Sequence, residues 1–259
     1  MCMECDVLKI NREERKTLKD IVTDEIILTI FLNEKELLTL LCSPGKLKEL
    51  SVGFLYSSGL ISSMNDIENV FVNISTMTCH IKVKEHGIPA DVIFKRIYTS
   101  GCGKGVLFHS MLDVIHEKTV TKKVQIPSEK IIHLMKDFEK KSTVYKETGG
   151  VHNAALSDGE NILVFTEDIG RHNAIDKVIG EALYRNLNME DLLVLTSGRI
   201  SSEVMYKVQK MRSAFIISRS APTSLAVKLA DKWNVTLIAF ARGHRMNVYT
   251  GKERIPEKM

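Results

Sequence analysis

The sequence lacks long apolar runs, and this excludes a membrane-spanning helix. The longest apolar stretches, such as Leu192–Leu195 and Ala214–Ile217, have the length of a buried strand, whereas a helix needs about 20 apolar residues to cross a bilayer. The N-terminus is polar and carries no signal-peptide core. We therefore expect a cytoplasmic protein that does not bind a membrane.

The sequence also has few cysteines and a low net charge. Five cysteines, an odd number without regular spacing, are typical of reduced thiols rather than of a disulfide framework. The formal net charge is only +4 and basic residues are spread among acidic ones, so the sequence does not indicate nucleic-acid binding. What is present is an ordinary globular composition, 44% hydrophobic over 259 residues, which suffices for one large or two modest domains.

The hydrophobic pattern changes near residue 100. Before it, alternating runs predict strands at 26–31, 36–40, 70–72 and 80–83, with one helix over Leu47–Tyr56. After a helix over Ser128–Lys141, strands alternate with helices: strands Asn161–Phe165, Leu192–Leu195, Ala214–Ile217 and Val235–Phe240, and helices Ala174–Tyr184, Ser202–Met211 and Thr223–Lys232. We therefore expect an α/β fold with an N-terminal tail over residues 1–23, a smaller α+β domain over 24–100, and an α/β domain with a mostly parallel sheet over 101–259.

One thiol lies in a loop with almost no side chains. Cys102 stands in the run Thr99-Ser100-Gly101-Cys102-Gly103-Lys104-Gly105, in which glycines expose the sulfur and let a ligand approach the backbone. An apolar helical pattern begins at Val106, so we expect Cys102 at a helix N-terminus, where the dipole and Lys104 favour the thiolate. The pattern indicates a nucleophilic sulfur, and a buried structural cysteine beside a tight turn is the alternative.

Three predicted strands each run into a loop of hydroxyl, glycine and arginine residues. These loops are Thr196–Arg199, Ser218–Ser224 and Phe240–Arg245. In an open parallel sheet the carboxyl ends of the strands line the ligand crevice, helix N-termini there offer N–H groups to anions, and arginine binds phosphate oxygens. We expect a phosphate-binding crevice, with ordinary solvated turns as the alternative. Its residues are Ser197, Arg199, Ser220, Ser224, Phe240, Ala241, Arg242, Gly243, His244 and Arg245.

A fourth segment, which follows the first strand of the predicted sheet, is dense in polar residues. We assign Arg171, His172 and Asn173 to the same crevice. Asn173 is also a candidate helix N-cap, with Asp176 three positions later closing a capping box. Capping does not explain Arg171, His172 or Lys177, which favours a binding role for this segment.

These segments resemble the FdhD/NarQ family of formate dehydrogenase accessory sulfurtransferases. The resemblance covers nearly everything from about residue 24 onward and is most specific in Gly170-Arg171-His172-Asn173 with Asp176-Lys177. The other matching segments are the Cys102 loop, Leu47–Ile61, Gly149–Leu156, Asp168–Gly180, Thr196–Val204, Ser218–Ala226 and Phe240–Thr250.

The resemblance implies a function and its partners. By this resemblance Cys102 accepts sulfane sulfur as a persulfide from a cysteine desulfurase. The sulfur then passes to the molybdenum or tungsten of a bis(pterin guanine dinucleotide) cofactor, the bound substrate, before the catalytic subunit of formate dehydrogenase receives it. The guanine dinucleotide explains a phosphate-binding crevice. The resemblance also implies a C-terminal domain similar to the cytidine deaminase fold, and we expect a homodimer.

The loop departs from the family pattern in one respect. Many members carry two cysteines spaced C-x-x-C there, and in this chain Gly105 occupies the second position, so Cys102 is the only candidate acceptor in the loop. Cys2 and Cys5 form a C-x-x-C pair at the N-terminus, which we interpret as part of a mobile tail, with a relay thiol as the alternative. Two further cysteines lie in apolar strand-like segments and are expected in the core: Cys42 and Cys79.

Two other functions stay open on the sequence alone. One is a thiol hydrolase in which the imidazole of His152 activates Cys102, although a partnered histidine at an apolar edge is the simpler interpretation of His152. The other is a non-enzymatic chaperone that carries the metal cofactor. Zinc deaminases need H-x-E and a later P-C-x-x-C, whereas this chain has His152-Asn153-Ala154 and no C-x-x-C after it. We therefore expect no zinc and no resident metal.

Overall fold

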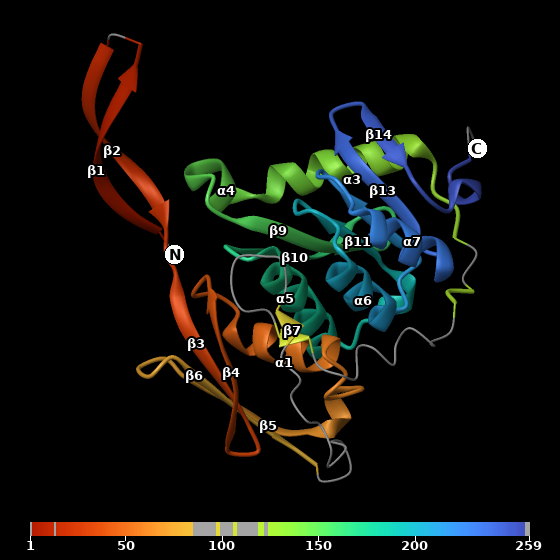
Figure 1. The fold of residues 1–259 in the computed structure, drawn as a ribbon, viewed down its shortest axis with the longest axis horizontal. Coiled ribbons are helices and arrows are strands. Elements are labelled where there is room, and N and C mark those ends of the chain that lie inside the picture. The colour runs from red at the N-terminus through yellow and green to blue at the C-terminus, as the bar shows by residue number, and fades with distance from the viewer. Residues whose placement is uncertain are drawn as a thin grey trace.

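The computed structural model describes residues 2–12, 14–84, 97–98, 106–107, 119–121 and 124–256. A six-stranded sheet organises the C-terminal part of these residues and a four-stranded sheet the N-terminal part (Figure 1). Each part has its own cluster of buried hydrophobic side chains, and Tyr56 and Leu183 pack against both clusters. The architecture is mixed α/β, and the domain boundaries expected from the sequence stay a prediction.

The six-stranded sheet is mixed rather than mostly parallel. Its strands are β9 (His152–Ser157), β10 (Ile162–Asp168), β11 (Leu193–Thr196), β12 (Phe215–Ser218), β13 (Thr236–Arg242) and β14 (Arg245–Val248), in the order β10-β9-β11-β12-β13-β14. Only β11–β12 and β12–β13 are parallel pairs. The expectation was wrong because β9 and β14, which the pattern did not identify, run against the other strands. Each belongs to a hairpin whose turn has a glycine at positive φ, Gly159 or Gly243, and a short turn returns the chain antiparallel.

The strands that alternate with helices follow the prediction to within a few residues. The helices of this part are α3 (Ser128–Lys141), α4 (Thr143–Thr148), α5 (Arg171–Tyr184), α6 (Ser202–Met211) and α7 (Ser224–Lys232). Right-handed crossovers through α5, α6 and α7 place all three on one face of the sheet, and α3 covers the other (Figure 1). The central strands β11 and β12 are buried on both faces, so every position before their last residue is apolar.

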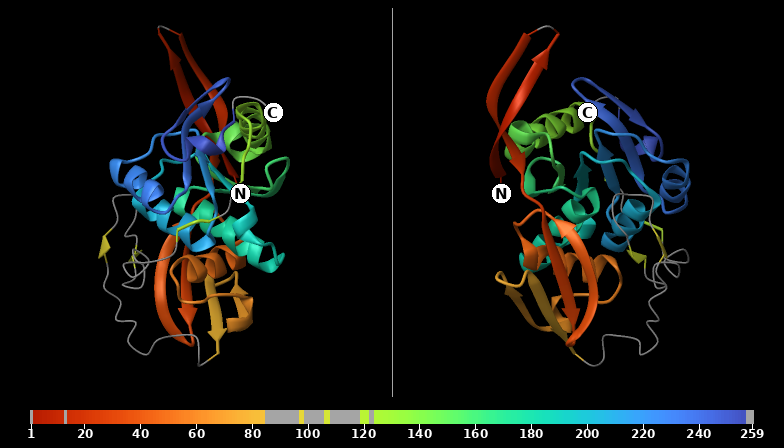
Figure 2. Two further views of the ribbon diagram at one scale, coloured as in Figure 1. Left: turned by 90° about the vertical axis from the view of Figure 1, so that its right-hand side faces the viewer. Right: turned by 60° about the vertical axis from the view of Figure 1, so that its left-hand side comes forward.

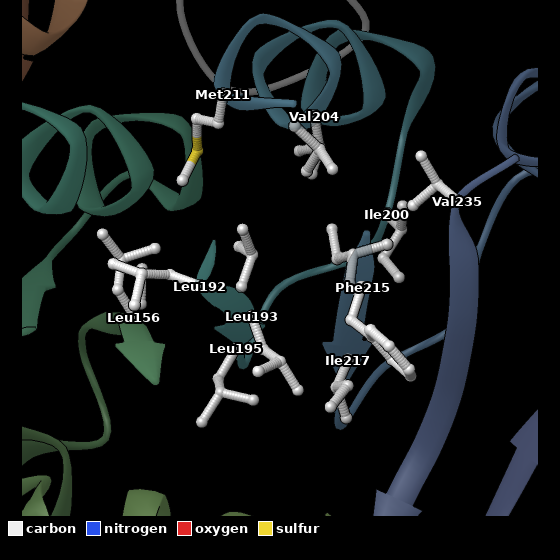
Figure 3. Close-up of a cluster of buried hydrophobic side chains, with 14 of the residues drawn as sticks. Leu156, Leu192, Leu193, Leu195, Ile200, Val204, Met211, Phe215, Ile217 and Val235 are labelled. Atoms are coloured by element: carbon white, nitrogen blue, oxygen red, sulfur yellow. The ribbon is translucent and has the colours of Figure 1, made fainter. Parts of the chain in front are cut away.

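The larger core fills the space between this sheet and its helices. Figure 3 shows the side chains of β11 and β12 together with those of α6, among them Leu193, Phe215, Val204 and Met211. All four are at most 2% exposed. This packing holds the carboxyl ends of the strands in fixed positions.

The N-terminal part is α+β, as the sequence predicts. Its elements are β3 (Ile26–Leu32), β4 (Lys35–Cys42), α1 (Leu47–Ser57), the 3₁₀ turn η1 (Met64–Asp66), β5 (Ile67–Asn73) and β6 (Thr78–Val83). The sheet order is β4-β3-β6-β5. One face packs against α1, and alternate residues such as Leu28 and Ile30 of β3 point into this second core. Two further 3₁₀ turns belong to the C-terminal part: η3 (Met189–Asp191) and η4 (Lys252–Arg254).

Two glycines join the two parts by letting α1 and α5 touch. A Cβ added to Gly53 of α1 would lie 1.8 Å from the carbonyl oxygen of Asp176, and one added to Gly180 of α5 would lie 1.9 Å from the carbonyl oxygen of Glu49. Such distances are impossible for any side chain, so both positions require glycine. The close crossing fixes α5, and with it the segment that begins this helix, relative to the N-terminal sheet.

The residues expected to form an N-terminal tail form a long β-hairpin. Strands β1 (Cys2–Asn11) and β2 (Glu14–Thr23) pair along their whole length. The hairpin projects from the molecule (Figure 2), and its base contacts α4, with Thr23 close to Gly150. Both strands contain β-branched residues, valine and isoleucine in β1 and threonine, isoleucine and valine in β2, which favour this pairing. Cys2 and Cys5 are three positions apart on one extended strand, so they point to opposite faces.

A short strand pair flanks the cysteine loop in sequence. β7 (Ile97–Tyr98) pairs antiparallel with β8 (Val106–Leu107), so the helix expected from Val106 onward is wrong at these two residues. Apolar residues on both strands suit such pairing. Cys102 itself lies outside the described residues. Among the residues described, no helix is long and apolar enough to cross a membrane.

Candidate functional site

The carboxyl ends of four strands meet at one edge of the six-stranded sheet. β10 and β11 are both antiparallel to β9, which lies between them, and therefore share one direction with β12 and β13. Asp168, Thr196, Ser218 and Arg242 end these strands. The three loops predicted to line a crevice thus lie at the same edge as the start of α5, although the sheet is mixed rather than mostly parallel.

Buried hydroxyl groups fix the loops that follow β11 and β12. Thr196 Oγ1 accepts a hydrogen bond from the N–H of Gly198 at 3.1 Å. Ser218 Oγ donates to the carbonyl oxygen of Gly198 at 2.7 Å and accepts from the N–H of Ser220 at 2.9 Å. These two hydroxyls therefore hold the loops together and are not free for a ligand, which leaves the side chains farther along each loop.

The β11–α6 loop carries Ser197 and Arg199. Ser197 Oγ accepts from the N–H of Asn153 at 2.9 Å and lies 3.3 Å from Nδ1 of His152. His152 is thus partnered at the start of β9, as expected. Burial lowers its pKa, and the nearby cations Arg171 and Arg199 lower it further, with Asp168 opposing. Arg199 is exposed, so this loop presents a guanidinium beside the imidazole of His152.

The other two loops contact one another. Arg242 Nε donates to the carbonyl oxygen of Arg219 at 2.6 Å, and Arg219 forms an ion pair of 2.9 Å with Glu139 of α3. The crevice residues Arg242, Gly243, His244 and Arg245 are exposed. Ser220 and Ala241 are half-buried and buried, and Ser224 is exposed in the first turn of α7.

Phe240 has an unusual backbone at this edge. Its φ is +53°, a left-handed conformation that bulky side chains rarely adopt, and it lies where the register of β13 against β14 shifts. Its N–H donates to the carbonyl oxygen of Ser220 at 3.1 Å. The bulge therefore bends the end of β13 toward the β12 loop, which is consistent with the strained backbone often found at binding sites.

The start of α5 differs from the prediction. The helix begins at Arg171 and its N-cap is Gly170, without a side-chain cap, so the expectation that Asn173 caps the helix is wrong. Asn173 instead donates from Nδ2 to Asp168 Oδ1 at 3.0 Å and to the carbonyl oxygen of Leu41 at 2.8 Å. The side chain of Asn173 therefore bonds to the buried carboxylate of Asp168, which a capping rule based on local sequence does not predict.

Two buried ion pairs lie behind this helix start. Asp168 pairs with Lys177 at 2.6 Å and Asp176 with Lys207 at 2.5 Å, and all four residues are buried. Each pair also reaches the N-terminal part: Ser43 donates its N–H to Asp168 at 3.1 Å, and Ser57 Oγ donates to Asp176 at 2.7 Å. Lys177 and Asp176 therefore position α5 and do not face a ligand. The expected capping box through Asp176 is wrong for the same reason.

Glu203 is a residue that sequence reasoning missed. Its Oε2 lies 3.3 Å from Nε2 of His172, which connects the first turns of α6 and α5. Burial, then Lys207 and Arg171, lower the pKa of His172 to about 3, with His152 acting in the same sense. Burial raises the pKa of Glu203, against the effect of Arg171 and Lys207. The only feature of the sequence that could have indicated Glu203 is its position one turn before Lys207 on α6.

The helix starts at this edge are capped unequally. Thr223 caps α7, because its Oγ1 accepts the N–H of Ala226 at 3.2 Å. Ser201 is the N-cap of α6 but makes no side-chain cap bond. Its hydroxyl is buried and has no hydrogen-bond partner among the described residues. The start of α6 therefore lacks the side-chain cap that α7 has.

Arg171 of α5 also lies close to the start of α6. A Cβ on Gly198 would lie 2.7 Å from Cβ of Arg171, so the first residue of α5 packs directly on the loop that leads into α6. Arg171 and His172 therefore lie beside the β11–α6 loop, as the sequence analysis expected.

The two cysteines expected in the core do not belong to the predicted crevice. Cys42 and Cys79 are buried, as expected, and burial raises the pKa of Cys42 to about 12. Within the described residues no group of three or more His, Cys, Asp or Glu side chains could hold a metal ion. A cavity of about 140 Å³ lies beside β10, and none of the predicted crevice residues lines it.

The chain is similar to known proteins over nearly its whole length. A model of the FdhD/NarQ family matches residues 23–256. The chain is 40% identical over 253 residues to the "Sulfur carrier protein FdhD" of Bacillus subtilis (strain 168), covering 97% of each. It is 42% identical over 256 residues to the protein of the same name from Listeria monocytogenes serotype 4b, covering 95% of this chain and 97% of that one.

A solved structure is also similar. It is described as "Crystal structure of a putative formate dehydrogenase accessory protein from Desulfotalea psychrophila". It matches with a TM-score of 0.81 and 25% sequence identity, and the match covers 98% of this chain and 99% of that one.

Proposed function

Because the chain belongs to the FdhD/NarQ family, we propose that it is a sulfurtransferase that serves formate dehydrogenase. It accepts sulfane sulfur from a cysteine desulfurase on Cys102 and delivers it to a molybdenum or tungsten bis(pterin guanine dinucleotide) cofactor, which is its substrate. The observation that carries the proposal is the match of nearly the whole chain to relatives named sulfur carrier proteins. The name of the similar solved protein supports formate dehydrogenase as the recipient.

The first step is an exchange between two sulfur atoms. The Cys102 thiolate attacks the terminal sulfur of the desulfurase persulfide, a new sulfur–sulfur bond forms on Cys102, and the desulfurase cysteine leaves as a thiolate. On delivery this bond breaks and Cys102 returns to the thiolate. The sulfur leaves as sulfide with two electrons, which the reduced metal centre of the substrate supplies.

The strand-end edge supports binding of the guanine dinucleotide arms. Exposed guanidinium groups at Arg199, Arg242 and Arg245 suit phosphate oxygens. The unpartnered hydroxyl of Ser201 at the start of α6 fits an acceptor that comes from a ligand. His152 and His172 favour the neutral form, so these imidazoles can donate or accept hydrogen bonds without adding charge. In this proposal the edge holds the phosphates and Cys102 carries the sulfur.

Further parts of the proposal concern the whole molecule. We propose that the C-terminal part is similar to the cytidine deaminase fold, that the protein is a cytoplasmic homodimer, and that it holds no zinc of its own. Elemental analysis of the purified protein tests the last point, since one tightly held zinc per chain would contradict it.

Loading with sulfur tests the proposal. After incubation with a cysteine desulfurase and cysteine, mass spectrometry should find one added sulfur atom on Cys102, because an accessible thiolate is the reactive species. Cys102→Ser should abolish loading, whereas the matched double variant Cys2→Ser/Cys5→Ser should load normally. Loading that survives Cys102→Ser and fails in the double variant would show a different acceptor. No persulfide on any cysteine would favour the cofactor chaperone or the Cys102–His152 thiol hydrolase instead.

A further inference from the structure

The hairpin of β1 and β2 is a sheet of only two strands. In the described part of the chain neither strand pairs with a third one, so each has an outer edge where every second residue directs its N–H and C=O away from the hairpin. The hairpin projects from the molecule (Figure 2). An isolated two-stranded hairpin is marginally stable in water, so a further strand along one edge would stabilise it.

Apolar side chains of the hairpin are exposed. Val7 of β1 and Leu18 of β2 lie opposite each other near its middle, and both are half-buried. Five other large hydrophobic residues of the hairpin are between 36% and 57% exposed: Met3, Leu8, Ile10, Ile21 and Val22. Apolar surface gathered on one projecting element is typical of a site where another chain binds.

Two charged residues of β2 lack an ion-pair partner. Lys16 lies directly opposite Lys9 of β1, and like charges in this position destabilise a strand pair. Lys19 is paired with Glu4 at 2.7 Å, but neither Lys16 nor Asp20 forms an ion pair within the described residues. Since residues four apart on a strand share a face, an ammonium and a carboxylate without partners lie on the same face of the hairpin.

We propose that β2 pairs antiparallel with β2 of a second copy of this chain, about a two-fold axis that passes beside Leu18. A two-fold axis perpendicular to a sheet makes a strand run antiparallel to its own copy. Lys16 then lies opposite Asp20 of the second copy, and Asp20 opposite Lys16 of that copy. Leu18 lies opposite its own copy with Val7 beside it in each hairpin, so an apolar row crosses the middle of a four-stranded sheet.

The charges of β2 select this register among those that pair most of the strand. An axis at Thr17 would place Arg15 opposite Lys19, and an axis at Lys19 would place two ammonium groups opposite each other. Axes at the charged residues two positions to either side of Leu18 would also place a charge opposite its own copy. Since like charges directly opposite are destabilising, the axis at Leu18 is favoured.

The outer edge of β1 offers no equivalent register. An axis at Asp6 would place two carboxylates opposite each other, and an axis at Val7 would bring no opposite charges together. The charge pattern therefore favours β2 as the edge that pairs.

Charge reversal tests the pairing by sedimentation of the full chain over a range of concentrations. Lys16→Asp and Asp20→Lys should each weaken the dimer about 10- to 100-fold, because two attractive contacts become repulsive. A mixture of the two variants should form a heterodimer with the wild-type affinity, because both contacts again join opposite charges. Rescue in the mixture also shows that both variants fold. Glu36→Lys on β4 is the matched control: Glu36 is exposed outside the hairpin, and the change in charge equals that of Asp20→Lys, so the dimer should be unaffected.

A cross-link tests the register. Leu18→Cys in a Cys2→Ser/Cys5→Ser background should form an intermolecular disulfide on mild oxidation, because Cβ atoms of directly opposite residues lie about 4.5–5.5 Å apart. Thr17→Cys in the same background is the control and should not link to its own copy, which is two residues out of register. Peptide mapping identifies the linked residues, and a link through position 17 in place of position 18 would contradict the register.

This pairing names the surface of the homodimer that belongs to the proposed function, and it does not depend on sulfur transfer. A dimer that each reversal weakens and the mixture restores supports the pairing. A wild-type dimer that both reversals leave intact would show that the β2 surface is wrong while the homodimer stands. A wild type that stays monomeric overturns both, whereas a persulfide on Cys102 would still support the sulfurtransferase.

Discussion

The ammonium of Lys207 on α6 and the carboxylate of Asp176 on α5 form an ion pair of 2.5 Å within the interior of the protein. Ser57 of α1 donates to the same carboxylate at 2.7 Å. Three helices from both parts of the chain thus meet at one buried charge. Either charge would be unstable if it were buried without the other. The position of α5 therefore depends on both α6 and α1.

We expect Asp176→Asn to destabilise the protein by about 3–5 kcal/mol, because it leaves the ammonium of Lys207 buried without a counter-charge. Lys207→Met should cost a similar amount. The double variant Asp176→Leu/Lys207→Met should be more stable than either single variant, since replacing a buried pair by apolar side chains of similar volume is often neutral. Denaturant unfolding measures all three. Additive losses in the double variant would show that the two residues do not act as a pair.

Gly180→Ala should destabilise the protein by about 2–3 kcal/mol, because the new Cβ would meet the carbonyl oxygen of Glu49 at 1.9 Å and force α1 and α5 apart. The sign of the change in stability distinguishes a crowded position from an uncrowded one. In the interior of an uncrowded helix the same change stabilises by about 0.5–1 kcal/mol. A more stable Gly180→Ala variant in thermal or denaturant unfolding would therefore contradict the close crossing.

The periodicity of the sequence predicts most elements of the fold but not how two strands pair. β11, β12 and β13 and the helices between them carry strong apolar patterns, so their positions follow from local sequence. β9 contains His152 and Asn153 and was not recognised, and β14 is short and polar. Their antiparallel direction depends on turns, and hairpin β1–β2 depends on pairing between two strands that are mostly exposed. Neither is encoded in the period of a single segment.

The candidate site, like the fold, could be predicted from the sequence only in part. Loop composition identified the edge where Arg171, His172 and Arg199 gather, because residues after parallel strands must meet there. Local rules failed for Asn173 and Asp176 because Leu41, which accepts from Asn173, and Lys207, which pairs with Asp176, are distant in sequence. Glu203 and Ser201 were missed because their significance comes from the contact between two helix starts. Contacts of this kind become visible only in three dimensions.

Arg199→Ala and Arg242→Ala should each weaken GDP binding about 10- to 150-fold, since a charge-assisted bond to phosphate contributes about 1.5–3 kcal/mol. Added salt should weaken binding further, because both side chains are exposed and screened. Both variants should still form the persulfide on Cys102, since loading and cofactor binding use different surfaces. Unchanged affinity in both variants by calorimetry would show that these loops are ordinary solvated turns.

The stability of the protein should fall as the pH decreases from about 7 to 5, in part because of His172. Burial lowers the pKa of this histidine to about 3 in the folded chain, whereas it is about 6.5 in the unfolded chain. Below pH 6.5 the unfolded state therefore binds a proton that the folded state does not, and the stabilisation present above pH 6.5 is lost progressively toward pH 3. His152 shifts in the same direction and Glu203 in the opposite one.

The variant His172→Gln isolates this contribution because it keeps a polar side chain and removes the titrating group. The free energy of unfolding should change between pH 7 and pH 5 by about 2 kcal/mol more in the wild type than in the variant, since each pH unit below 6.5 costs about 1.4 kcal/mol for one such group. Denaturant unfolding at both pH values gives this double difference, from which any constant effect of the substitution cancels. An equal pH dependence in the two proteins would mean that His172 is protonated normally in the folded state, and that the contact with Glu203 is a solvated ion pair rather than a buried neutral one.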